Sequence, residues 1–154
     1  MSHELLSLLV RWTHVISMAG MLGGAVLVWA MSVHAGGPVL GEHGGLLLAL
    51  AETYERLFWL AMGVQVMTGA GNLGAFGTAL PGPATAWGGR FALKLLAVLI
   101  FLAFSLLRTL VLARLTQAGG LRSARVARMF QSFYGGTALA LAAIALLAVA
   151  LAHG

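Results

Sequence analysis

Four long apolar segments dominate this chain, and they constrain its fold more than any other feature. They run roughly over residues 5–33, 57–76, 91–115 and 129–152. A helix needs about 20 apolar residues to cross the hydrocarbon core of a bilayer, and inside lipid it must satisfy its own backbone polar groups. The sequence therefore predicts an all-α integral membrane protein. We expect residues 1–154 to form a single domain, a four-transmembrane-helix bundle with up-down topology.

The composition of the chain agrees with a lipid environment. Hydrophobic residues make up 60% of it and charged residues only 8%, whereas soluble domains carry about 25% charged residues. The absence of cysteine excludes disulfides, thiolate zinc sites, iron–sulfur clusters and covalent c-type haem. The net charge of +5 comes from basic residues beside the apolar segments. We therefore expect the lipid bilayer, and no nucleic acid, as a partner.

The connections and their charges predict an orientation. Glycine and proline at 35–38, 81–83 and 118–120 punctuate the chain between the apolar segments. The second helix has an earlier possible start near Leu46, as an amphipathic approach that carries Glu52, Glu55 and Arg56. The basic residues expected at the side of the first and third loops are Arg56, Arg114, Arg122, Arg125 and Arg128. Those expected at the side of the termini are Arg11, Arg90 and Lys94. The positive-inside rule then favours an orientation with both termini outside the cytoplasm.

His14 lies about ten residues inside the first apolar segment. Ionisable residues at membrane depth are costly and mark functional sites by default. Met18 and Met21 follow at i+4 and i+7, so all three side chains share one helical face. Imidazole with thioethers suits Cu(I), and His with Met is an axial pair for haem iron. Methionine at this spacing is also common as plain packing.

Depth matching in an up-down bundle limits the partners of His14. Met67, Thr68 and Lys94 are expected at its level, and Gln65 deeper. His34 is 20 residues further on, roughly 30 Å along an ideal helix. The other histidines are expected in a loop or near the termini, and they are His3, His43 and His153. A haem with two histidine ligands from one copy of the chain is therefore not predicted.

A cluster of cations is expected on the His14 side of the bundle, formed by Arg11, Arg90 and Lys94. Snorkelling to the interface would explain these side chains without a ligand. Haem propionates would pair with them, whereas a bare copper ion would be repelled. This difference favours haem b over copper as the cofactor.

The remaining charged residues are expected toward the ends of the bundle. We expect no carboxylate pair within the membrane, and we expect Arg108 near the inner interface with Arg114. Gly20 and Gly24 form a small-xxx-small pair, which predicts close helix packing or else room for a flat cofactor or a dimer face.

Several motifs, in this order, resemble the CopD copper-resistance domain over nearly the whole chain. They are Arg11-Trp12-x-His14 with Gly23-Gly24, Arg56-Leu57-Phe58 with Met67-Thr68-Gly69, Trp87-Gly88-Gly89-Arg90 with Lys94-Leu95, and the basic stretch from Arg122 to Arg128. Met21 stands where the CopD pattern has tryptophan, and the acidic residue expected early in the last helix is absent, with Gln131 nearby.

The resemblance implies copper handling by a multi-pass protein of a prokaryotic-type inner membrane. A more distant likeness to the small HemJ membrane proteins implies haem b and protoporphyrinogen oxidation. By that likeness, His14 and Lys94 are the candidate cofactor residues.

Three functions follow as hypotheses. In the first, His14 ligates a b-type haem, and the sixth ligand is Met67 or Met18 or is absent. The haem propionates would pair with Arg11, Arg90 and Lys94. The haem would serve electron transfer, or porphyrin redox chemistry if the protein is an oxidoreductase. The protein would act as a homo-oligomer or as a subunit of a respiratory complex. The second is copper binding or transport through His14, Met18, Met21 and Met67. The third is a cofactor-free accessory subunit of a larger membrane enzyme.

Overall fold

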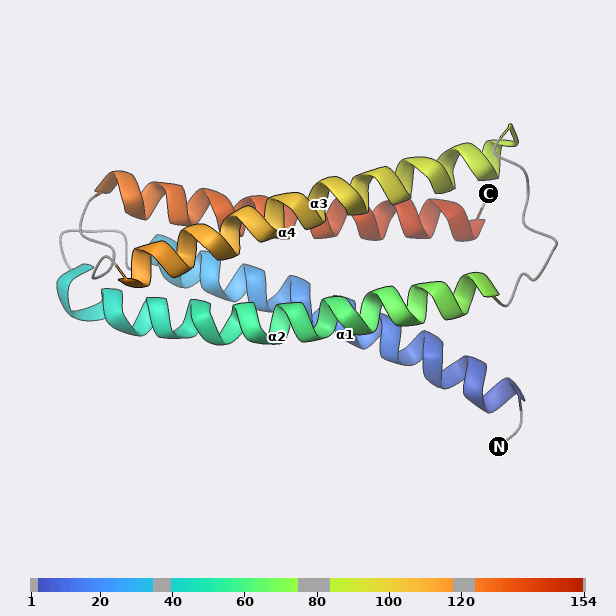
Figure 1. The fold of residues 1–154 in the computed structure, drawn as a ribbon, viewed down its shortest axis with the longest axis horizontal. Helices are drawn as coiled ribbons and strands as arrows, with labels where there is room; N and C mark the ends of the chain where they lie inside the picture. Colours follow the sequence, from blue (N-terminus) through green and yellow to red (C-terminus); the bar gives the residue numbers. More distant parts are fainter. Residues whose placement is uncertain (1–2, 35–39, 75–83, 118–123, 154) are drawn as a thin grey trace.

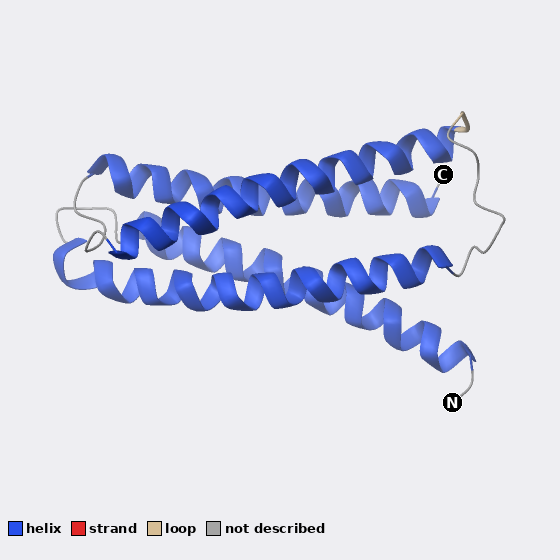
Figure 2. Ribbon diagram, in the orientation of Figure 1, coloured by secondary structure: helices blue, strands red, loops and turns tan. Residues whose placement is uncertain are grey.

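The computed structural model describes residues 3–34, 40–74, 84–117 and 124–153, with side chains for 4–34, 44–70, 84–117 and 126–151. The regular structure in these ranges is helical throughout (Figure 2). Its elements are α1 (His3–His34), α2 (Leu40–Gly74), α3 (Ala86–Gln117) and α4 (Ala124–His153). The predicted connections at 35–38, 81–83 and 118–120 lie outside the described residues.

The four helices run alternately up and down, as predicted, and both termini lie at one end of the bundle (Figure 1). The end of α2 and the start of α3 lie at that same end. Helix α1 packs mainly on α2 and α4, and α4 packs on α3, whereas α2 and α3 touch much less. The ion pair described below is therefore an important link between α2 and α3.

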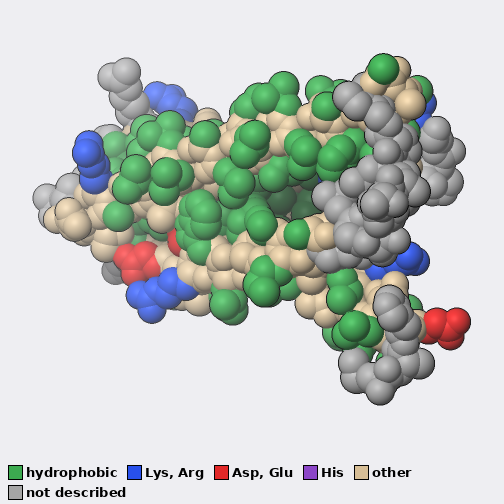
Figure 3. All heavy atoms as spheres, turned by 45° about the vertical axis from the view of Figure 1, so that its right-hand side comes forward, with side chains coloured by type: hydrophobic (Ala, Val, Ile, Leu, Met, Phe, Trp, Pro, Cys, Tyr) green, Lys and Arg blue, Asp and Glu red, His purple; other side chains and the backbone are tan. Residues whose placement is uncertain are grey.

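Three of the four helices are long and apolar enough to cross a membrane. They cover Glu4–His34, Ala86–Gln117 and Val126–Leu151, and α2 does not meet the same standard within its described residues. Apolar side chains cover most of the visible face of the molecule, and lysine and arginine gather toward its two ends (Figure 3). Such a surface is that of a multi-pass membrane protein in a lipid bilayer.

Helix α2 is longer than predicted. It begins at Leu40, ahead of both the main prediction near residue 57 and the alternative near Leu46. His43, predicted in a loop, is therefore in the first turns of a helix. The charged residues predicted to form an amphipathic approach lie within a continuous helix, and Glu55 is buried in it.

The buried core fills only one half of the bundle, the half away from the termini. Its fully buried side chains include Met21, Val28, Phe58, Tyr134 and Leu141. Among the described residues of 4–20, 63–70, 84–100 and 142–151, which form the other half, only Gly88 is buried, and no side chain is. That half, which contains His14, is therefore loosely filled by the part of the chain that the structure describes.

One of the predicted small residues has a clear packing role. A Cβ atom on Gly24 would lie 2.6 Å from Cδ2 of Tyr54, so only glycine lets this ring pack against α1. Gly20 has no such neighbour within 4 Å. The pair thus contributes to packing inside the bundle through Gly24.

Candidate functional site

His14 is half-buried and contacts α2. Its Nδ1 atom lies 2.7 Å from Oγ1 of Thr68, the residue that depth matching predicts at its level. The Thr68 hydroxyl in turn lies 2.6 Å from the carbonyl oxygen of Val64, one turn earlier in α2. The imidazole is therefore tied to the α2 backbone through a single hydroxyl group.

The backbone of α1 is also fixed at this point. The Gln65 side-chain amide donates to the carbonyl oxygen of His14 at 2.5 Å and to Oγ of Ser17 at 2.9 Å. The Ser17 hydroxyl donates to the same His14 carbonyl at 3.0 Å. Gln65 precedes Thr68 by three residues in α2, and its long side chain reaches the turn of α1 that carries His14 and Ser17.

The methionines predicted around His14 have different surroundings. Met21 is buried in the core at 2% exposure, and Met18 packs partly against that core. Met67 is 76% exposed, so it is not packed in the α1–α2 interface that holds His14. Met67 directly precedes Thr68 in α2, but its exposure shows that its side chain points away from His14.

The predicted cations also differ in how far they are buried. Lys94 is half-buried and lies near enough to His14 for their charges to interact. It makes no hydrogen bond or ion pair with another described residue. Arg90 and Arg11 are exposed. Lys94 is therefore the cation of this set that accompanies His14 in the bundle.

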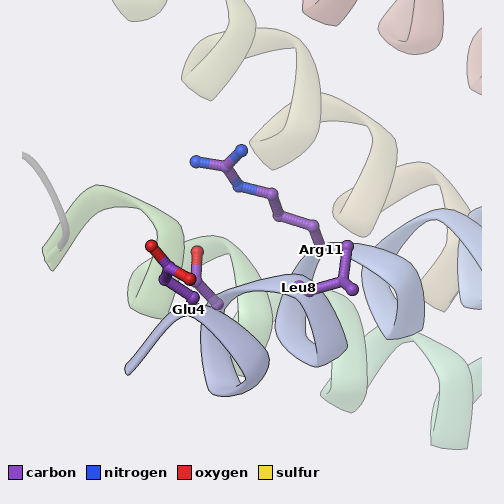
Figure 4. Close-up of a pocket in the computed structure, with 4 residues that line it drawn as sticks. Glu4, Leu8 and Arg11 are labelled. Atoms are coloured by element: carbon purple, nitrogen blue, oxygen red, sulfur yellow. The ribbon is translucent and has the colours of Figure 1, made fainter. Parts of the chain in front are cut away.

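Arg11 belongs to a separate surface feature on the first turns of α1. An open pocket of about 420 Å³ is lined there by Glu4, Ser7, Leu8 and Arg11. Figure 4 shows the Arg11 side chain extended away from α1. It is thus available to an anionic group near the end of the bundle that holds the termini.

A second polar centre, which the sequence did not reveal, lies in the packed half of the bundle. Arg108 is 1% exposed and Glu55 5%. Nε of Arg108 donates to Oε1 of Glu55 at 2.7 Å, and its Nη2 donates to Oε2 at 3.1 Å. The prediction of Arg108 at the inner interface is wrong, because this bidentate pair lets the guanidinium lie in the core.

The remaining polar groups of this centre complete its hydrogen bonding. Tyr134 donates to Oε1 of Glu55 at 3.0 Å, and Thr109 to Oε2 at 2.5 Å. Nη1 of Arg108 donates to Thr137 at 2.5 Å. The carboxylate thus accepts four hydrogen bonds, and both of its oxygens are saturated.

Aromatic rings enclose the same ion pair. The guanidinium carbon of Arg108 lies 4.4 Å from the centre of the Phe58 ring and 5.5 Å from that of Tyr54. The Tyr54 hydroxyl donates to the carbonyl oxygen of Met21 at 3.0 Å, which connects the cluster to α1. We call Glu55, Arg108, Thr109, Tyr134 and Thr137 the charge clamp. Together with Tyr54 it joins all four helices.

The charge clamp had a weak signal in the sequence. Ser105 and Thr109 flank Arg108 on α3, and Tyr134 and Thr137 are spaced i, i+3 on α4. Polar residues in the middle of apolar helices indicate a polar interior. The assignment of Glu55 to an amphipathic approach ahead of the second apolar segment hid this pattern, and the burial of Glu55 in α2 corrects it.

Within the described residues, no group of three or more His, Asp or Glu side chains could hold a metal ion. A metal held by this part of the chain would therefore need a ligand set of another kind, such as a porphyrin with one histidine. Comparisons with models of protein families, with curated proteins and with solved structures give no match to this chain. Its likeness to CopD and HemJ remains a resemblance of motifs.

Proposed function

We propose that this protein holds a b-type haem in the loosely filled half of its bundle, with His14 as the axial ligand. Two features that occur together in this half of the bundle carry the proposal. No described side chain is buried there, and the half-buried imidazole of His14 lies in it. A flat apolar ring with a metal at its centre would use both the space and the imidazole.

The charges near His14 fit the same ligand. Lys94 would pair with a propionate, and Arg11 and Arg90 are exposed toward the same end of the bundle. Because Met67 is 76% exposed, we propose a haem with His14 as its one protein ligand. When bound, haem would supply one-electron redox chemistry, for electron transfer or porphyrin oxidation.

We also propose that α2 crosses the membrane with the other three helices. It is antiparallel to α1 and packs against it (Figure 1). Glu55, which lowers its apolar character, is paired with Arg108 and nearly excluded from solvent. A paired charge that faces a bundle interior is tolerated at membrane depth. By the distribution of basic residues, both termini would lie outside the cytoplasm.

Absorbance of the protein purified from haem-replete cells tests the cofactor. We expect a Soret band in the wild type and its loss in His14→Ala. His34→Ala is the matched control, because His34 is exposed and its Nδ1 atom bonds to its own helix at Ala30. A colourless wild type would refute the haem proposal, and so would a band unchanged in His14→Ala. Copper at unit stoichiometry in that colourless protein would support the copper hypothesis instead.

A further inference from the structure

The hydroxyl of Thr68 has more short contacts than it has protons. Its Oγ1 atom lies 2.6 Å from the carbonyl oxygen of Val64, 3.3 Å from that of Gln65 and 2.7 Å from Nδ1 of His14. A carbonyl oxygen can only accept a hydrogen bond, whereas an imidazole nitrogen can donate or accept. The direction of the His14 bond therefore follows from where the single hydroxyl proton goes.

The carbonyl contacts favour one assignment. If Thr68 donated to His14, its oxygen would lie 2.6 Å from the Val64 oxygen with no proton between them, and two acceptors repel at that distance. If Thr68 donates to Val64, which is a common bond for threonine within helices, its lone pairs are left for an N–H donor. The Nδ1 atom of His14 is then protonated.

We propose that Thr68 is a positioning residue that holds His14 as the Nδ1–H tautomer and so presents the lone pair of Nε2 to a metal. For the metal, this rests on the haem function proposed above. Metal-binding histidines generally donate their other ring nitrogen to a neighbouring acceptor, and this fixes tautomer and ring orientation. In this protein the acceptor is a hydroxyl whose own proton is held by the α2 backbone.

Two neighbours of the ring support its fixed position. A Cβ atom on Gly69 would lie 3.8 Å from Cε1 of His14, so the ring lies against α2 next to Thr68. Gln65 holds the His14 carbonyl. The ring and the backbone of His14 are therefore both attached to the same stretch of α2, and Thr68 is the contact of the ring nitrogen.

The first test uses the protein without haem. In ¹⁵N-histidine spectra at alkaline pH, where imidazole is neutral, we expect His14 as the Nδ1–H tautomer in the wild type and in Thr68→Ser. In Thr68→Val, which keeps the shape and loses the acceptor, we expect the Nε2–H tautomer to become dominant. His14→Gln assigns the signal, and His34, whose Nδ1 also bonds to a carbonyl, is an internal reference that should not change.

The second test uses the haem-loaded protein. We expect Thr68→Val to weaken haem binding by roughly 10- to 100-fold and to shift its midpoint potential, with Thr68→Ser close to the wild type. If His14 is already Nε2–H in the wild type, or if Thr68→Val changes neither tautomer nor affinity, the role of Thr68 is refuted. If the tautomer changes as expected but the wild type binds no haem, the tautomer assignment holds and the haem function fails.

Discussion

The charge clamp allows a sharp prediction about stability. Replacing Arg108 by methionine leaves the Glu55 carboxylate, 5% exposed, with hydrogen bonds from Tyr134 and Thr109 alone. Breaking a buried ion pair in this way costs about 3–5 kcal/mol. We expect Glu55→Met to cost a similar amount, because it leaves the Arg108 guanidinium in the core with Thr137 as its hydrogen-bond partner.

The double variant Glu55→Met/Arg108→Met should be more stable than either single variant. It removes both charges, the Thr109 hydroxyl turns from Glu55 to the carbonyl oxygen of Ser105, and Thr137 keeps its bond to the carbonyl oxygen of Phe133. Only the Tyr134 hydroxyl loses its acceptor, at about 1–3 kcal/mol. The predicted cost of the pair is therefore about 1–3 kcal/mol, against a sum of about 6–10 kcal/mol for independent residues.

Unfolding in mixed micelles, followed by helical circular dichroism during titration with a denaturing detergent, measures these free energies. Arg114→Met is the matched control, because Arg114 is exposed on the same helix, and we expect a change within about 0.5 kcal/mol. Single variants that each cost under about 1 kcal/mol, or costs that simply add in the double variant, would show that the two residues do not act as a buried pair.

Three further predictions concern packing, topology and the ligand. Gly24→Ala should lower the melting temperature by several degrees, because its Cβ atom would overlap a buried tyrosine ring, and Gly20→Ala should leave it within a degree or so. In this cysteine-free chain, Thr85→Cys and Thr116→Cys should react with an impermeant thiol reagent from opposite sides of the membrane. Equal labelling from one side would contradict four crossings. Lys94→Gln should weaken haem binding several-fold without altering the Soret maximum, and equal affinity in a titration would exclude a propionate contact.

Hydropathy predicted the helical class and the alternating topology, because both depend on the sum of many apolar residues. Counting along antiparallel helices also brought His14 level with Thr68, which it contacts. The same counting could not tell that Met67 is exposed, since it gives a position along the helix axis and not the rotation of a side chain about that axis. Helix α2 was predicted too short, because averaging hydropathy over Glu52, Glu55 and Arg56 treats these charged residues as exposed.

The error at Glu55 has a specific physical cause. Its cost in lipid is offset by Arg108 on α3, 53 residues away in the chain, and no local window contains both partners. Each residue was therefore assigned to an interface, where a lone charge would belong. The pair can be predicted only when helix packing brings the two residues to the same depth and face.

The separation of the two polar centres leads to a last prediction. Glu55 and Thr68 are 13 residues apart on α2, about 20 Å along the helix. The clamp lies in the packed half and His14 in the loosely filled half, so each should be alterable without the other. His14→Ala should abolish haem binding with little loss of stability in the haem-free protein. The double clamp variant should lose stability and keep the wild-type Soret maximum. A Soret maximum that moves in the clamp variant would mean that the packing of one half sets the geometry of the other.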